Sequence, residues 1–254
     1  MNAAVATKSL PESTTRSQQP AGSAFTKRLE TKLGHVLEAV EQSEPYRALM
    51  APESSPRQIA TILKYVLLEV FSYGPHVTEA TFLAISRLPK NRPDLMKPMI
   101  LHDLEEVDHG EMALRDFVKL GGDESWARER RITPESFAMG ATCRWLAAQE
   151  SPFAYLGYMY LFEALTPILT ARVQAVLTVK SFPTAARHFI DFHAAEDIAH
   201  AKAMLSLIER VTRDYPEAAA AIEYGFDCFA TVYPLPIWRA ALRHARTELE
   251  GGAK

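Results

Sequence analysis

The chain has 254 residues, of which 48% are hydrophobic, so it is long enough to bury a substantial core in one domain. Its formal net charge is −3 and its basic residues are scattered, which gives no electrostatic footprint for nucleic acid. With no run of about 18 apolar residues, no secretory leader and only two cysteines, we expect a cytoplasmic protein that does not enter a membrane.

Helical periodicity dominates the chain after its first residues. Residues 1–24 are rich in Ala, Ser, Thr, Pro and Gln and have no apolar period, which predicts a disordered N-terminal tail. Over residues 25–254 no segment alternates with a period of two for long, so we expect one all-α domain, a bundle of about seven helices. Ser55-Pro56 and Thr133-Pro134 mark two helix starts. The expected helices are 25–48, 55–88, 91–120, 134–149, 151–180, 183–213 and 217–248.

The expected helix 55–88 carries a carboxylate in apolar surroundings. Glu69 lies in the run Tyr-Val-Leu-Leu-Glu-Val-Phe, where a carboxylate needs a partner or a metal ion. Glu79 is the alternative metal ligand on this helix, because Pro75 disturbs the register between the two positions. A satisfied core carboxylate is the competing interpretation of Glu69.

Two later stretches repeat one metal-ligating pattern: His102-x₃-Glu106-x₂-His109 and His193-x₃-Asp197-x₂-His200. Each residue of an α-helix adds about 100° of rotation, so the first, fifth and eighth positions of the pattern share one face. Imidazoles and carboxylates are ligands for divalent first-row metals, and two such faces opposed could hold two ions.

The second pattern lies in an apolar stripe rather than on a solvated face. Its face continues through Phe189, Met204 and Leu207, whereas Arg187 and Lys202 mark the opposite side. Unpaired polar groups are costly in such a stripe, which favours a metal site. A buried network of His–carboxylate pairs without metal is the alternative.

Between the two patterns, Glu163 stands alone among apolar and aromatic residues. Together with Glu69 it would complete a known di-metal arrangement, in which two acid-x-x-His units combine with one carboxylate from each of two more helices. Such nitrogen and oxygen ligands suit iron or manganese better than calcium or magnesium. Three tyrosines near these ligands are candidates to donate hydrogen bonds or electrons, with core packing as their commoner role: Tyr73, Tyr158 and Tyr160.

These residues resemble the haem-oxygenase-like superfamily, which contains the TenA and PqqC proteins, and within it the branch of di-iron oxidases and oxygenases. The resemblance covers about residues 55–213. It rests on three segments: His102-Asp-Leu-Glu-Glu-Val-Asp-His109 followed by Leu120-Gly121, Leu156-Gly157-Tyr158 leading to Glu163, and His193-x₃-Asp197-x₂-His200.

The resemblance implies a haem-oxygenase-like bundle with two ferrous ions that use O₂ to oxidise a small substrate, such as an amino acid, a fatty acid or an aromatic precursor. The acidic ligand before His109 is either Glu105 or Glu106, and the same-face argument favours Glu106. His102 stands where some relatives have Glu, so its role as a ligand is open. A mixed manganese–iron pair, a homodimer and an external electron donor are further expectations. The ligands that the resemblance implies are His109, Glu163, His193, Asp197 and His200.

Other functions compete with this one. A TenA-like pyrimidine hydrolase uses a cysteine nucleophile without metal, and Cys143 is its candidate, although such a cysteine is more often a small buried hydrophobe. A PqqC-like oxidase would activate O₂ without a metal cofactor, through buried His and Tyr side chains. Metal storage would need an entry path and a cage that the sequence does not show. Haem binding through His35 would leave the two repeated patterns unexplained.

Overall fold

The computed structural model of the chain describes residues 21–251, apart from the side chains of residues 21–23 and 196–198. Every regular element in this range is helical, which confirms the predicted all-α fold class. Most of the predicted tail, residues 1–20, lies outside the described residues. The elements are α1 (Ala21–Glu41), α2 (Glu44–Met50), α3 (Pro56–Arg87), α4 (Pro93–Glu106), α5 (His109–Lys119), α6 (Glu124–Glu129), α7 (Pro134–Ala148), α8 (Ala154–Val179), the 3-10 turn η1 (Thr184–Ala186), α9 (His188–Asp214), α10 (Ala218–Val232) and α11 (Leu235–Gly251).

Local sequence signals fix several helix ends. The hydroxyls of Ser55 and Thr133 accept hydrogen bonds from backbone N–H groups at the starts of α3 and α7, each followed by proline as predicted. The expected helices 25–48, 91–120 and 217–248 each divide in two, so the helices outnumber the seven predicted. The division of 91–120 falls between Glu106 and His109, where the poor helix formers Val107 and Asp108 lie.

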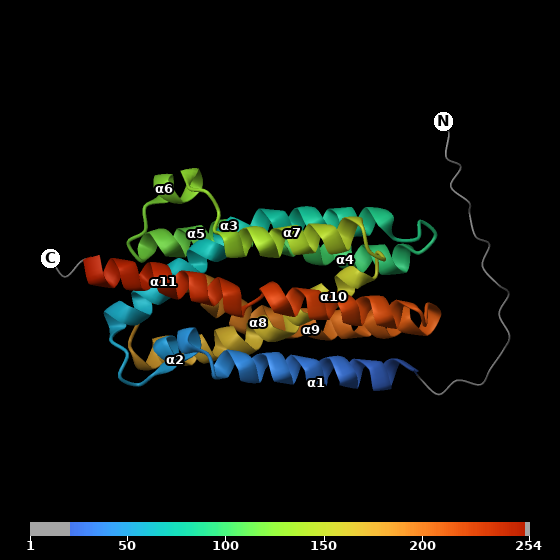
Figure 1. The fold of residues 1–254 in the computed structure, drawn as a ribbon, viewed down its shortest axis with the longest axis horizontal. Helices are drawn as coiled ribbons and strands as arrows, with labels where there is room; N and C mark the ends of the chain where they lie inside the picture. Colours follow the sequence, from blue (N-terminus) through green and yellow to red (C-terminus); the bar gives the residue numbers. More distant parts are fainter. Residues whose placement is uncertain (1–20, 252–254) are drawn as a thin grey trace.

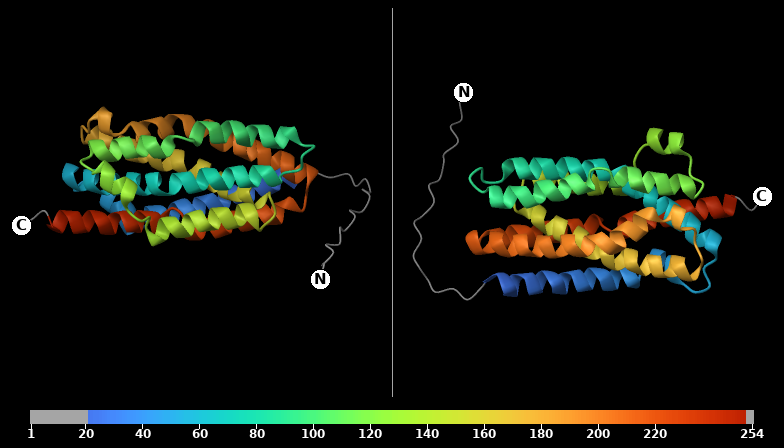
Figure 2. Two further views of the ribbon diagram at one scale, coloured as in Figure 1. Left: turned by 90° about the horizontal axis from the view of Figure 1, so that it is seen from above. Right: turned by 180° about the vertical axis from the view of Figure 1, so that it is seen from behind.

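The long helices lie side by side along the longest axis of the molecule (Figure 1). Helices α3, α4, α5 and α7 form one layer and α1, α8 and α9 form another, while α10 and α11 run along the front of both (Figure 2). Helix α8 is the central element, because it packs against both α9 and α10. None of the helices between residues 21 and 251 combines the length and apolar composition that a bilayer-spanning segment needs.

Helices α8 and α10 approach each other closely through two glycines. A Cβ atom on Gly157 would collide with the carbonyl oxygen of Ile222, and one on Gly225 would collide with that of Ala154. Both obstacles are backbone atoms, which cannot rotate away. This contact fixes the distance between the two helices and so the position of α8 in the bundle.

We therefore expect Gly157→Ala to lower the free energy of unfolding by about 1–3 kcal/mol, because the added methyl overpacks this contact. Gly34→Ala is the matched control, since Gly34 lies in α1 with no other atom within 4 Å of the added methyl. The control should gain about 0.5–1 kcal/mol from the better helix propensity of alanine. Urea unfolding followed by circular dichroism measures both. Equal stability of the two variants would contradict the close contact.

Candidate metal centre

Side chains from α4, α5, α8 and α9 meet between the two layers and form two groups of potential metal ligands. In each group, one ligand atom from every member lies within 4.8 Å of the others. Glu106 belongs to both groups, so they are adjacent and share a carboxylate. We call them the outer group (His102, Glu106, Glu163 and His200) and the inner group (Glu106, His109 and His193).

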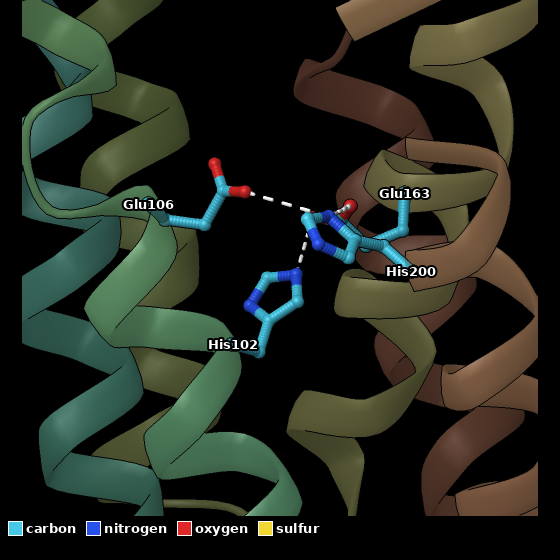
Figure 3. A group of neighbouring side chains, drawn as sticks. All are labelled: His102, Glu106, Glu163 and His200. Carbon is cyan, nitrogen blue, oxygen red and sulfur yellow. Dashed lines mark ion pairs between the residues drawn. The ribbon is translucent and has the colours of Figure 1, made fainter. Parts of the chain in front are cut away.

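The outer group joins the two layers across the interior. His102 and Glu106 project from α4 towards Glu163 on α8 and His200 on α9 (Figure 3). His102 Nε2 lies 3.1 Å from Glu163 Oε1, and His200 Nδ1 lies 3.5 Å from Glu163 Oε2. The same nitrogen of His200 lies 3.6 Å from Glu106 Oε1. The donor atoms of this group therefore converge on one small volume.

The inner group is the more deeply buried. His109 Nδ1 lies 2.6 Å from Glu106 Oε2 and 3.1 Å from His193 Nε2. When His193 Nδ1–H donates to the carbonyl oxygen of Phe189, at 2.7 Å, the lone pair of Nε2 faces the group. Burial and the neighbouring His109 lower the pKa of His193 to about 4, so its imidazole is neutral, as a metal ligand must be.

Charges in the outer group balance one another. Burial opposes ionisation of Glu163, but hydrogen bonds with His102 and His200 outweigh it and hold the pKa of this carboxyl well below its usual range. Glu163 in turn raises the pKa of His200 to about 9. Burial acts against protonation of His102, yet Glu163 still raises the pKa of this imidazole. Without metal, protons on imidazoles therefore supply the positive charge that the carboxylates require.

The residues present fit a pair of transition-metal ions. His102 Nδ1 and Glu106 Oε1 are buried and have no hydrogen-bond partner among the described residues, which is rare for buried polar atoms. Four imidazoles and two carboxylates make up the donor set, and this mixture of nitrogen and oxygen suits iron or manganese.

The carboxylates predicted on α3 lie outside both groups. Thr133 Oγ1 and Ser136 Oγ each donate a hydrogen bond of 2.6 Å to Glu69, and Arg130 approaches the same carboxylate. Glu69 is thus a satisfied core carboxylate, the competing interpretation. The alternative, Glu79, pairs with Arg144 at 2.9 Å near the surface.

Glu105 and Asp197 are two further candidates from the sequence. Glu105 Oε2 lies 2.9 Å from His200 Nε2, and the side chain of Glu105 is 63% exposed. Glu105 therefore contacts His200 from the solvent side and belongs to neither group. The structure thus places Glu106, not Glu105, in both groups. Asp197 lies on α9, but its side chain is outside the described residues, and its role as a ligand stays a prediction.

A cavity borders both groups. Most of its lining residues are apolar or aromatic. Tyr73 and Tyr158 line it, whereas Tyr160 packs against Phe226 and is not among its lining residues. Sequence analysis missed Asp103, which also lines the cavity and is 2% exposed. Burial raises the pKa of this carboxyl to about 6.

The residues proposed for the competing functions lie elsewhere. Cys143 is buried, is not among the residues that line the cavity, and has a pKa that burial raises to about 12. Its thiol is therefore neither ionised at neutral pH nor in contact with a ligand in the cavity. His35 lies exposed on α1.

A family model described as iron-containing redox enzyme matches residues 64–233, well over half of the chain, so the chain belongs to this family. The matched segment contains every member of the outer and inner groups. A search of curated proteins found no match.

Solved structures share the fold at low sequence identity. The chain is similar to a domain of unknown function with a haem-oxygenase-like fold from Shewanella denitrificans (TM-score 0.70, 18% identity, 89% of this chain and 93% of that one). It is also similar to a TenA homologue from Pseudomonas syringae pv. tomato (TM-score 0.66, 15% identity, 93% of this chain and 100% of that one). A third similar structure is a CADD-like protein of unknown function from Nostoc punctiforme (TM-score 0.64, 16% identity, 89% of this chain and 97% of that one). These similarities confirm the predicted haem-oxygenase-like bundle.

We expect iodoacetamide at pH 8 to leave Cys143 unmodified in the folded protein, because its thiol is buried and its pKa is about 12. Cys228, which is only partly buried, is the internal control, and denaturation should expose both thiols. Peptide mass spectrometry reports each site separately. Rapid modification of Cys143 in the native protein would instead support a thiol nucleophile.

The pKa of about 9 for His200 predicts that metal binding to the stripped protein releases a proton below that pH, because an imidazole must be neutral to ligate. The affinity for Mn²⁺ should therefore rise between pH 6.5 and 8.5, by about tenfold per pH unit for each proton released. Titration calorimetry in buffers of different ionisation enthalpy counts the protons. His200→Gln should bind more weakly and with a shallower dependence on pH. An affinity of the unmodified protein that does not change with pH would contradict the assignment.

Proposed function

We propose that this member of the iron-containing redox enzyme family is a non-haem di-iron oxidase or oxygenase that uses O₂ to oxidise a small organic substrate. The observation that carries the proposal is that Glu106 belongs to two adjacent groups of imidazole and carboxylate donors. A shared carboxylate would hold two ions close enough to act on one O₂ molecule.

In this proposal the outer group holds one ion and the inner group holds the other, with Glu106 between them. Asp197 is a further ligand, from the same helix as His193 and His200. When bound, two ferrous ions supply electrons to O₂ and make it reactive towards the substrate, and a manganese–iron pair would use the same donors.

The protein's own side chains prepare this site in three ways. The apolar walls of the cavity, including Tyr73 and Phe162, keep water away from the ligands and leave room for a substrate. The hydrogen bond from His193 Nδ1 to the backbone orients its imidazole. The contact of His200 Nε2 with Glu105, at 2.9 Å, orients this imidazole with Nδ1 towards the outer group.

The number of electrons needed to reduce O₂ implies that the proposed enzyme also uses an external electron donor. Reduction of O₂ to two water molecules takes four electrons, and a substrate oxidised by two electrons supplies half of them. An external electron donor would then supply the other two. A homodimer stays a prediction of the resemblance.

Two metal-free alternatives are related to the same fold. The similarity to a TenA homologue fits a hydrolase, but Cys143 is sealed away from the cavity, which favours the oxidase. A PqqC-like oxidation without metal draws support from Tyr73 and Tyr158, which line the cavity beside the histidines. Substrate-dependent O₂ uptake that survives complete removal of iron would favour the latter.

We expect the stripped protein to bind close to two ferrous ions per chain under anaerobic conditions. Glu106→Gln should bind fewer ions, because it removes a negative donor from both groups at once. Iron per chain is measured after gel filtration, by a colorimetric chelator assay.

Two variants serve as controls for this loss. Glu79→Gln, near the surface, should keep both the iron and the stability. Glu69→Gln should keep the iron but lower the melting temperature, because it weakens a buried hydrogen-bond network. Iron loss in Glu69→Gln with none in Glu106→Gln would reverse the assignment.

A further inference from the structure

The cavity beside the metal-ligating groups has an unusual distribution of charge. No lysine or arginine is among its lining residues. All the imidazoles and carboxylates that line it belong to the outer or inner group, with the exception of Asp103. Apart from these groups, the walls therefore offer a ligand one acidic side chain and no basic one.

The carboxylate of Asp103 has a hydrogen-bond partner for only one of its two oxygens. It lies on α4 and is 2% exposed. The hydroxyl of Thr81 bonds to its carboxylate, and Thr81 is itself hydrogen-bonded to the hydroxyl of Tyr155. Asp103 Oδ2 has no hydrogen-bond partner in the described part of the chain. Asp103 thus combines a place in the cavity wall with a carboxylate oxygen that has no partner among the described residues.

A buried carboxylate without a cation is costly, and a ligand that brings a cation would remove this cost. A protonated amine is such a ligand, because its N–H groups form charge-assisted hydrogen bonds with a carboxylate. A ligand carboxylate, in contrast, would face Asp103 with no lysine or arginine in the cavity wall to compensate, and the imidazoles there are either already paired with a carboxylate or neutral. The apolar walls, which include Val70, Val77 and Phe162, suit a hydrocarbon or aromatic body.

We propose that Asp103 is a substrate-binding residue and that the substrate is an apolar amine without a free carboxylate, its ammonium group bound by Asp103 and its apolar body in the cavity. The part of this inference that concerns a substrate rests on the proposed oxidase function. The binding preference itself does not require iron.

Three ligands with the same tail and different head groups test the proposal: octylamine, octanol and octanoate. Their affinities are measured by titration calorimetry on the metal-free full chain at pH 8, so that no ion can bind octanoate. Octylamine should bind at least about tenfold more tightly than octanoate, with octanol between them. Octanoate that binds as tightly as octylamine would overturn the proposal.

Variants locate the preference. Asp103→Asn keeps the shape of the side chain, and it should reduce the affinity for octylamine to that for octanol while leaving octanol unchanged. Thr166→Val is the matched control, because Thr166 lines the same cavity and its loss removes polarity without changing charge. It should keep the preference for the amine. If Asp103→Asn keeps that preference, the amine binds elsewhere and the proposal fails.

A second variant covers the case in which Asp103→Asn does not fold, as judged by its circular dichroism spectrum. Thr81→Val retains the carboxylate but removes the hydroxyl that orients it, and it should lower the affinity for octylamine several-fold more than that for octanol. Equal losses for both ligands would contradict the role of Asp103. A preference for the amine in a protein that binds no iron would refute the oxidase and leave the binding site standing.

Discussion

The interior of this bundle contains several ionisable side chains, and the need to satisfy them constrains the rest of the structure. Glu163 is 3% exposed near the middle of α8, the central helix, so its charge must be balanced by groups from other helices. The balance comes from His102 on α4 and His200 on α9. Helices α4, α8 and α9 must therefore be positioned so that these three side chains meet. The close contact of α8 with α10 helps to fix the position of α8.

The two repeated patterns meet in a simple way. His102 pairs with His200, with ring centroids 4.8 Å apart, and His109 pairs with His193 at 4.6 Å. The first histidine of one pattern thus meets the last histidine of the other, as expected for equal spacing on segments that run in opposite directions. Glu106 lies between the two histidine pairs, and this position lets it belong to both groups. The break between α4 and α5 falls beside Glu106, so the ligands of the first pattern are divided between two helices.

Sequence reasoning predicted the residues that combine an unusual type with a buried face. The histidines of both patterns, Glu106 and Glu163 could be found because polar groups in an apolar stripe demand a reason. Glu69 meets the same criterion but lies outside both groups, because its partners Thr133 and Ser136 come from a distant helix start, and their approach depends on tertiary packing. Asp103 was missed for the opposite reason. An aspartate next to a histidine on an amphipathic helix looks solvated, and only the packed bundle reveals its burial.

The proposed metal pair and Asp103 place opposite charges along one cavity, and this arrangement limits how an amine substrate can lie. Two divalent ions and an ammonium group repel one another strongly at the low dielectric of an apolar cavity. The amine nitrogen would therefore remain at the carboxylate of Asp103, which leaves the carbon atoms of the substrate as the part able to approach the ions. An oxidase that attacks carbon rather than nitrogen needs this orientation. Because the orientation comes from charge rather than from shape, amines with different apolar bodies would share it.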